Sequence, residues 1–159
     1  MRILIERADI SDFDGVNILV KERHEEHSLA LPHIFRQIDQ VMPLEYFRSL
    51  LTNPSSDILV ARQADEIVGF AVLEVKAAPL FESLIPRKYT YINDFGVASK
   101  HNRKGIGKKI FHACMDWAKS HGSTSLELNV WEFNNRAISF YESLGMETAS
   151  RKMTLSLDE

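Results

Sequence analysis

The chain has 159 residues, about the length of one ordinary domain, and its 45% apolar and 26% charged residues are close to the averages for globular proteins. This composition excludes a disordered, collagen-like or disulfide-scaffold protein. The net charge of −3 gives no general basic field for nucleic acid or an anionic membrane, so any anion site must be local. We expect one domain over residues 1–159 and neither of these two partners.

The location of the protein is indicated by two weak signals. Cys114 is the single cysteine, which rules out an internal disulfide and suits a reducing compartment. Residues 1–14 have too short an apolar run and too many acids for a signal peptide, and no run of eighteen apolar residues predicts a membrane span. We therefore expect a cytoplasmic protein.

Local patterns in the first half of the chain predict two helical segments between strands. Residues 1–7 alternate as in a strand, and caps at 9–14 precede a helix that carries Val16, Leu19 and Val20. The helical spacing is looser between 24 and 42, where it includes Ile34, Phe35 and Ile38. A helix that begins at Pro43 and a β-hairpin then follow, at residues 43–51 and at 58–62 with 67–77.

The second half predicts a strand, a long helix, a strand, a shorter helix and a last strand, at residues 89–98, 104–121, 125–131, 134–144 and 153–157. Gly122 and Gly145 stop the two helices. The element order is β-α-α-β-β-β-α-β-α-β. It indicates an α/β fold of the α+β type, with a mixed and mostly antiparallel sheet of six to seven strands and about four helices on its two faces.

The stretch 101-HNRKGIGKKI-110 lies between a predicted strand and a predicted helix. The first turn of a helix exposes N–H groups and the positive end of the helix dipole, which together attract anions. Gly105 and Gly107 would let a ligand approach the backbone, and Arg103, Lys104 and Lys108 add positive charge. The alternative is that the glycines only relieve a tight turn, and the residues alone leave both interpretations open. The pattern matches neither a Walker loop nor the GxGxxG fingerprint.

A second motif, 134-NNRAISFYESLGM-146, follows the next predicted strand. Ala137, Phe140, Tyr141 and Leu144 fall on one helical face. Asn134 can cap the helix or present its amide to a ligand, and a tyrosine hydroxyl at a cleft edge could act as a general acid. Spacing alone also fits a capped core helix with a buried aromatic pair.

The two motifs in this order resemble the GCN5-related N-acetyltransferase (GNAT) superfamily, with its R/Q-x-x-G-x-G/A signature and its later N-x-x-A-x-x-F-Y-x-x-x-G-F segment. The resemblance is close in the C-terminal half, and the element order agrees over the whole chain. It implies a GNAT-like fold and an acyl-CoA-dependent N-acetyltransferase, an acyltransferase of the EC 2.3.1 class. Such an enzyme transfers an acetyl group from acetyl-CoA to a primary amine of a small molecule or peptide in a ternary complex. It needs no metal and is a monomer or a homodimer. The alternative is a non-catalytic acyl-CoA sensor or interaction module on the same fold.

Carried over residue by residue, the resemblance implies that residues 103–108 hold the CoA pyrophosphate through their backbone amides. The strand end at 95–97 would pair with the pantetheine arm, and the Val97 amide would donate to the thioester carbonyl. Tyr141 would protonate the departing thiolate. The implied cofactor-binding residues are Phe95, Gly96, Val97, Asn102, Arg103, Lys104, Gly105, Ile106, Gly107, Lys108, Asn134, Ala137 and Phe140. Asn102 stands where the family usually has arginine or glutamine, and Met146 where it has phenylalanine.

An attacking ammonium must lose a proton, and Asp94 on the strand beside the expected cleft is the candidate base, with a structural carboxylate as the alternative. Glu132 is the reserve. In this family the segment that contains His33, Phe35 and Tyr46 tends to cover the acceptor site, so these three residues and Glu132 are candidates for substrate binding.

Two further features favour structural interpretations. Cys114 lies on the apolar face of its predicted helix, which indicates a buried and inert thiol. The run from His24 to His27 resembles a metal motif, but its histidines lack the HExxH spacing, which favours a solvated polar stretch.

Overall fold

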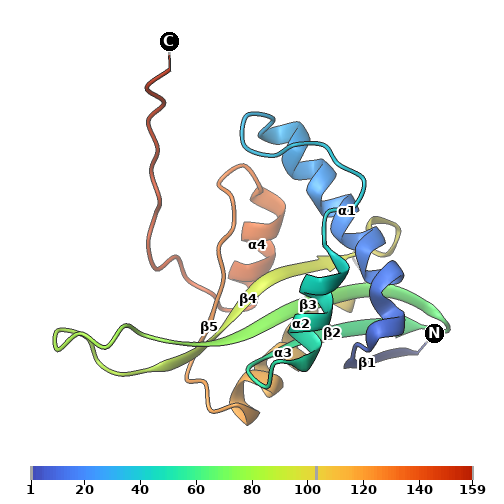
Figure 1. Ribbon diagram of the computed structural model, residues 1–159, viewed down its shortest axis with the longest axis horizontal. Coiled ribbons are helices and arrows are strands. Elements are labelled where there is room, and N and C mark those ends of the chain that lie inside the picture. Colours follow the sequence, from blue (N-terminus) through green and yellow to red (C-terminus); the bar gives the residue numbers. More distant parts are fainter. Residues whose placement is uncertain (1, 103, 159) are drawn as a thin grey trace. The chain divides into compact units, whose positions relative to one another are not determined.

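The computed structural model describes residues 2–102 and 104–158, and the chain divides into two compact units, Met1–Asn129 and Val130–Glu159. Arg103, predicted to bind the pyrophosphate, lies outside the described residues. The expectation of a single domain over residues 1–159 stays a prediction. In Figure 1 the first unit contains a twisted sheet with helices packed on it, and each unit is described below by itself.

The sheet of the first unit has five strands in chain order, β1 to β5. The strands are Ile3–Arg7, Ser56–Gln63, Glu66–Ala77, Lys88–Val97 and Leu126–Glu127. The first four pair antiparallel, whereas β5 runs parallel to β4. The α-helices of the described residues are α1 (Phe13–Ala30), α2 (Leu44–Thr52), α3 (Ile106–Ser120) and α4 (Asn135–Ser143). The mixed, mostly antiparallel sheet and the four helices confirm the predicted α/β class.

Helices α1 and α2 pack on one face of the sheet. Val16 and Leu19 of α1 and Phe47 of α2 form a buried cluster with Phe70 and Val72 of β3, which point to this face because alternate residues of a strand share a face. Such a cluster removes several large apolar side chains from water, and each contributes about 1.5–3 kcal/mol to folding. It holds α1 and α2 firmly over the middle of the sheet.

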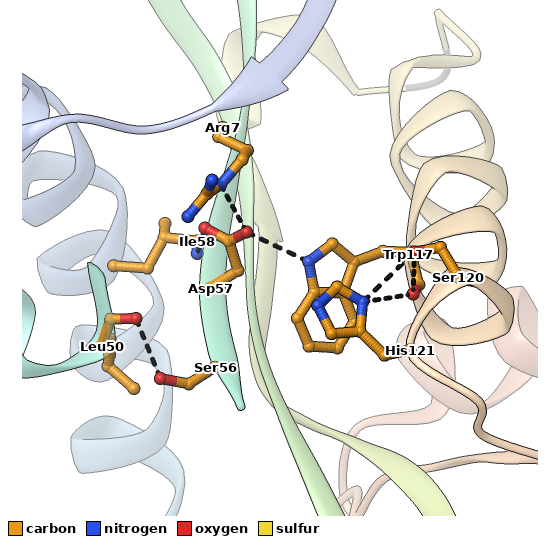
Figure 2. A network of polar contacts seen from close by, with 8 residues as sticks. All are labelled: Arg7, Leu50, Ser56, Asp57, Ile58, Trp117, Ser120 and His121. Carbon is orange, nitrogen blue, oxygen red and sulfur yellow. Dashed lines mark hydrogen bonds and ion pairs between the residues drawn. The ribbon is translucent and has the colours of Figure 1, made fainter. Parts of the chain in front are cut away.

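Helix α3 packs on the other face. It approaches β3 so closely that a Cβ on Gly69 would lie 2.5 Å from Cδ1 of Ile110. Figure 2 shows the polar contact that holds this helix: the buried carboxylate of Asp57 on β2 lies 3.0 Å from Nε1 of Trp117, which donates to it, and 2.6 Å from Nε of Arg7. The imidazole of His121 stacks on Trp117, with ring centroids 3.8 Å apart. These contacts hold the C-terminal end of α3 against β2, while Ile110 packs against β3 nearer its start.

The predicted count of six to seven strands is wrong, because the described residues form five. The predicted strand 125–131 is reduced to Leu126–Glu127, and the predicted strand 153–157 does not form. Met153, Leu155 and Leu157 alternate as in a strand, but they are 84–89% exposed. Alternation becomes a strand only where a partner pairs the backbone and one face is buried, and the second unit provides neither among its described residues.

The helical spacing of Ile34, Phe35 and Ile38 also does not produce a helix. Helix α1 runs on to Ala30, and Leu31 leaves the helical region at φ −131° and ψ 64°. The reason is local: a residue that precedes proline, here Pro32, is pushed away from helical geometry. Residues 31–42 instead form a loop that crosses the end of α1.

Candidate active site

The glycine loop, residues 102–108 without the undescribed position 103, leads into α3. Gly105 precedes the helix in the left-handed conformation at φ +79°, which glycine adopts without strain. The Lys109 N–H donates to the Gly105 carbonyl at 3.2 Å, so the amides of residues 105–108 lie before the helix's own ladder of hydrogen bonds. A Cβ at Gly105 would meet no atom within 4 Å. The space beside Gly105 is therefore open to a ligand.

The charges around this loop are positive. Lys108 and Lys109 lie in the first turn of α3, which contains no acidic residue, and Lys104 is exposed just before it. The helix dipole repels lysines at a helix N-terminus, whereas an anion there is attracted by the dipole and by the lysines. Asn102 closes the preceding turn, its N–H donating to the Ser99 carbonyl at 3.2 Å. The start of the helix and the lysines near it together suit a diphosphate group.

Strand β4 contains an irregularity beside this loop. Val72 pairs with Asp94 but Leu73 pairs with Ile92, so Asn93 is an extra residue, a β-bulge. Beyond the bulge β4 continues against β3 to Val97, whereas its pairing with β5 consists of Thr90 and Tyr91 alone. Among the described residues of the first unit, no strand therefore lies beside the outer edge of 92–97. An extended ligand can pair with such an edge.

The side chain of Arg23 crosses β4 from α1. A Cβ on Gly96 would lie 2.5 Å from Cδ of Arg23, so only glycine allows this approach. The Nε of Arg23 lies 2.7 Å from Oδ1 of Asp94, which also accepts the Phe95 N–H at 2.9 Å. Asp94, the predicted base, is thus already engaged in an ion pair, with about a quarter of its side chain exposed.

This ion pair and three side chains near it lie on the face of the sheet that α1 and α2 cover, and we call the five residues the polar cluster: Arg23, His27, Tyr46, Glu74 and Asp94. Burial and the neighbouring Arg23 lower the pKa of His27, against a smaller opposite effect of Asp94. Burial, Glu74 and Asp94 raise the pKa of Tyr46. Glu74 accepts a hydrogen bond from Nδ2 of Asn93, the bulge residue, at 2.9 Å.

A cavity of about 170 Å³ opens beside the polar cluster, between α2 and β3. Glu74 is the charged side chain among its described lining residues, which are Tyr46, Ser49, Leu50, Asn53, Ser55, Ser56, Glu74 and Val75. Its size admits a small group such as an aminoalkyl chain, and its charge favours a cation. Tyr46, predicted to bind substrate, lines this cavity, and its pKa is raised by burial first and then by the Glu74 and Asp94 carboxylates.

In the second unit the motif 134–146 forms α4 with its predicted cap. The Asn134 side chain accepts the Ala137 N–H at 3.1 Å, and Phe140 and Tyr141 pack edge to face with centroids 5.4 Å apart. Gly145 ends the helix at φ +98°. The Asn134 side-chain oxygen thus caps the helix, and the reach of its amide nitrogen toward a ligand stays a prediction.

The remaining candidates have different surroundings. Phe35 packs against the imidazole of His27, with centroids 5.3 Å apart, while His33 is exposed on the same loop. Glu132 pairs with Arg151 at 3.5 Å. Cys114 is fully buried, and burial raises the pKa of its thiol to about 12, which agrees with the inert thiol inferred from sequence.

Sequence reasoning missed Arg23, His27 and Glu74. They come from α1 and β3, up to 71 positions from Asp94 along the chain, and no short motif connects them. The signal that could have found His27 is its spacing of four residues from Arg23, which places both on one side of a helix. The described residues contain no group of three or more His, Cys, Asp or Glu arranged to hold a metal ion. None of their helices is both long and apolar enough to cross a bilayer.

Comparison with known proteins gives consistent matches. The model of the acetyltransferase (GNAT) family matches residues 19–146. The uncharacterized N-acetyltransferase YhfO of Bacillus subtilis (strain 168) is 32% identical over 114 residues, which are 71% of this chain and 74% of YhfO. The crystal structure of a mutant of the BH1408 protein from Bacillus halodurans has a TM-score of 0.94 at 32% identity and covers 97% of this chain and 99% of its own. The aminoglycoside N-acetyltransferase AAC(6')-Iy, in complex with CoA, shares the fold, with a TM-score of 0.73 at 12% identity over 98% and 99% of the two chains.

Proposed function

Since the chain belongs to the acetyltransferase (GNAT) family, we propose that it transfers an acetyl group from acetyl-CoA to a primary amine of a small molecule or peptide. The observation that supports this most strongly is the helix start at Gly105, where a left-handed glycine with open space beside it precedes a first turn that contains lysines and no acidic residue. The helix start follows the end of β4, and β5 does not pair with β4 beyond Tyr91. A phosphate site next to a strand edge that extends beyond its pairing with β5 suits a cofactor with a diphosphate and an amide-containing arm.

The glycine loop would hold the diphosphate through the amides of Gly105, Ile106, Gly107 and Lys108. Lys104 adds charge, and the predicted contributions of Asn102 and Arg103 are retained in the proposal. Backbone groups of Phe95, Gly96 and Val97 would pair with the amides of the pantetheine arm, and Asn134, Ala137 and Phe140 would line it. Acetyl-CoA, when bound, supplies the acetyl group as a thioester.

The protein's own groups would then act on the reacting atoms. The Val97 N–H stabilises negative charge on the carbonyl oxygen, a role worth about 3–4 kcal/mol where such a donor has been removed. The Tyr141 hydroxyl donates its proton to the departing sulfur. Direct attack by the amine requires no residue of the protein to carry the acetyl group, and the buried Cys114 is unsuited to that role.

The acceptor would lie on the α1 and α2 side of β4, beside the polar cluster. Asp94 and Glu74 make this region negative, which favours an ammonium group, and the cavity beside Glu74 gives room for part of the acceptor. Tyr46, Phe35 and His33 lie on the two segments that cover this region. Asp94 as the base stays a prediction, and its ion pair with Arg23 makes it a less available one.

Two measurements test the proposal. Acetyl-CoA at saturation is expected to raise the melting temperature, and the absence of any shift would contradict the cofactor assignment. A panel of amines, assayed for release of the CoA thiol, identifies the acceptor. Binding without thiol release from any amine would favour the alternative, a non-catalytic acyl-CoA sensor on the same fold.

The acid role of Tyr141 has a matched control. Tyr141→Phe is expected to lower kcat by about 10²-fold or more, the usual contribution of a positioned acid, while the shift in melting temperature with acetyl-CoA is kept. Tyr89→Phe removes a hydroxyl at the opposite end of β4, where the ring stacks with Arg87, and should leave the rate unchanged. Equal rates for Tyr141→Phe and the unaltered protein would remove Tyr141 from this role.

A further inference from the structure

The polar cluster contains a group that can take the acceptor's proton and that no sequence motif indicates. An ammonium has no free electron pair, so it must lose one proton before it attacks a carbonyl carbon. We propose that His27 accepts this proton and is the general base of the reaction. The inference rests on the proposed function and adds to it a residue for which the sequence pattern favours only a structural interpretation.

The other members of the polar cluster are less suited to the role. Asp94 Oδ1 accepts from Arg23 Nε and from the Phe95 amide, so taking a proton would weaken an ion pair of 2.7 Å. The Glu74 carboxylate accepts from Asn93 at 2.9 Å and faces the cavity that we assign to the body of the acceptor. Tyr46 keeps its proton, because burial and two carboxylates raise its pKa. Arg23 is a cation at any working pH.

His27 has both the position and the charge state that a base needs. It lies one helical turn after Arg23 on α1, so the two side chains leave the helix on the same side. Arg23 lies directly over Gly96, which places this side of α1 above the part of β4 that we assign to the thioester. The imidazole is half-buried and packs against Phe35. Because burial lowers its pKa below 6.5, it is mostly neutral at pH 7 and can accept a proton.

The charges that act on His27 come from two elements. Arg23 and Glu26 lie on its own helix, and Asp94 lies on β4. After burial, the charge of Arg23 lowers the pKa of His27 most, whereas Asp94, a hydrogen bond with the Arg23 backbone and Glu26 raise it. The two members of the Arg23–Asp94 ion pair therefore act on the proton affinity of His27 in opposite directions.

The proposed step balances in atoms and charge. The acceptor ammonium loses two protons as the C–N bond forms and the C–S bond breaks. His27 takes the first and passes it to solvent. The second replaces the proton that Tyr141 gives to the sulfur, so the products are an amide, a thiol and one proton in solution.

The test compares His27→Gln with His24→Gln, using the best amine of the panel. His24 lies on the same helix, and its Nε2 contacts the Arg36 carbonyl, so it is the matched control. We expect His27→Gln to lose about 10²-fold in kcat at pH 7, with the acetyl-CoA melting shift kept, and His24→Gln to stay within about threefold of the unaltered protein. Addition of imidazole to His27→Ala should restore part of the rate, which a purely structural role would not allow.

The pH profile separates His27 from Asp94. In the unaltered protein kcat/KM should fall on the acid side with an inflection below 6.5, because His27 must be neutral to act. Asp94→Asn removes a charge that raises the pKa of His27, so it should move this inflection to lower pH without abolishing it. The proposal is overturned if His27→Gln keeps the acid inflection, or if Asp94→Asn abolishes it.

The titration of His27 can also be measured in the free protein, where no cofactor is bound and no turnover occurs. Imidazole resonances of the free protein, followed by NMR against pH, should give His27 an inflection below 6.5, and a value above it would contradict the proposal. The outcomes also distinguish a failure of the proposed function from a failure of the role assigned to His27. No melting shift with acetyl-CoA counts against the proposed function, whereas a shift and thiol release that His27→Gln leaves unchanged count against His27 alone.

Discussion

Gly105→Ala is the substitution that tests the anion site most directly. A second glycine, Gly122, has the same backbone conformation, so Gly122→Ala measures what an alanine costs in that conformation. Gly105 precedes α3 and Gly122 follows it, and both have φ of +79°. An alanine in this left-handed conformation costs about 1 kcal/mol relative to glycine. Neither new methyl group meets a clash: the first has no atom within 4 Å, and the second lies 3.5 Å from Lys88 Nζ. Both variants should therefore lose about 2–4 °C in melting temperature.

The two variants should differ when acetyl-CoA is added. The methyl group at position 105 would occupy open space beside the helix start, where the diphosphate is expected. Loss of one hydrogen bond to a charged group costs about 1.5 kcal/mol, or roughly tenfold in affinity. At a ligand concentration of about 100 times the dissociation constant, the stabilisation by ligand should fall from about 2.7 to about 1.4 kcal/mol in Gly105→Ala and stay near 2.7 in Gly122→Ala.

Thermal unfolding of the three proteins with and without acetyl-CoA measures these quantities. Titration calorimetry gives the affinities directly. If both variants keep the full stabilisation by ligand, or both lose it equally, then Gly105 does not form the site and the assignment of the diphosphate to this helix start is wrong.

Three further predictions concern the framework of the site. Asp57→Ala leaves the buried Trp117 N–H without its acceptor and should lower the free energy of unfolding by about 1–3 kcal/mol; an unchanged urea midpoint would show that the contact contributes nothing. The hydrogen bond from Arg62 lowers the pKa of Asp12 in the folded protein. The ionised carboxylate therefore adds its full contribution to the free energy of unfolding above the unfolded pKa of about 3.9, and this contribution is lost as the pH falls through the lower pKa of the folded state. Acid unfolding of Asp12→Asn should lack this dependence. Cys114 should resist alkylation at pH 8 until the protein unfolds, and rapid labelling of the native protein would contradict its burial.

The elements that the sequence predicted well are those with local signals at both ends. Gly105 and Gly122 bracket a broad apolar face, and α3 is found within two residues of its predicted bounds. The hairpin of β2 and β3 follows from two apolar runs around a polar turn. The cap at Asn134 and the end at Gly145 likewise give α4. In each case the neighbours along the chain decide the structure.

The elements that the sequence predicted poorly depend on partners far away in the chain. The bulge at Asn93 arises from the register between β3 and β4, which no local pattern encodes. Residues 153–157 have the alternation of a strand without the partner that a strand requires. The same limit applies to the site: the glycine loop is a contiguous motif, whereas Arg23, Glu74 and Asp94 meet only after α1 has packed on the sheet.

The two tryptophans of the chain provide a spectroscopic consequence of its division into two units. Trp117 lies in the first unit, only 8% exposed and stacked with the imidazole of His121, whereas Trp131 lies in the second and is 40% exposed. A buried indole emits at shorter wavelength than a hydrated one, so the fluorescence spectrum contains a separate component for each unit. Replacing Trp131 with phenylalanine would leave a single emitter on α3, the helix that begins at the glycine loop. The intensity and lifetime of that emitter would then follow the helix through ligand addition or denaturation without any attached label.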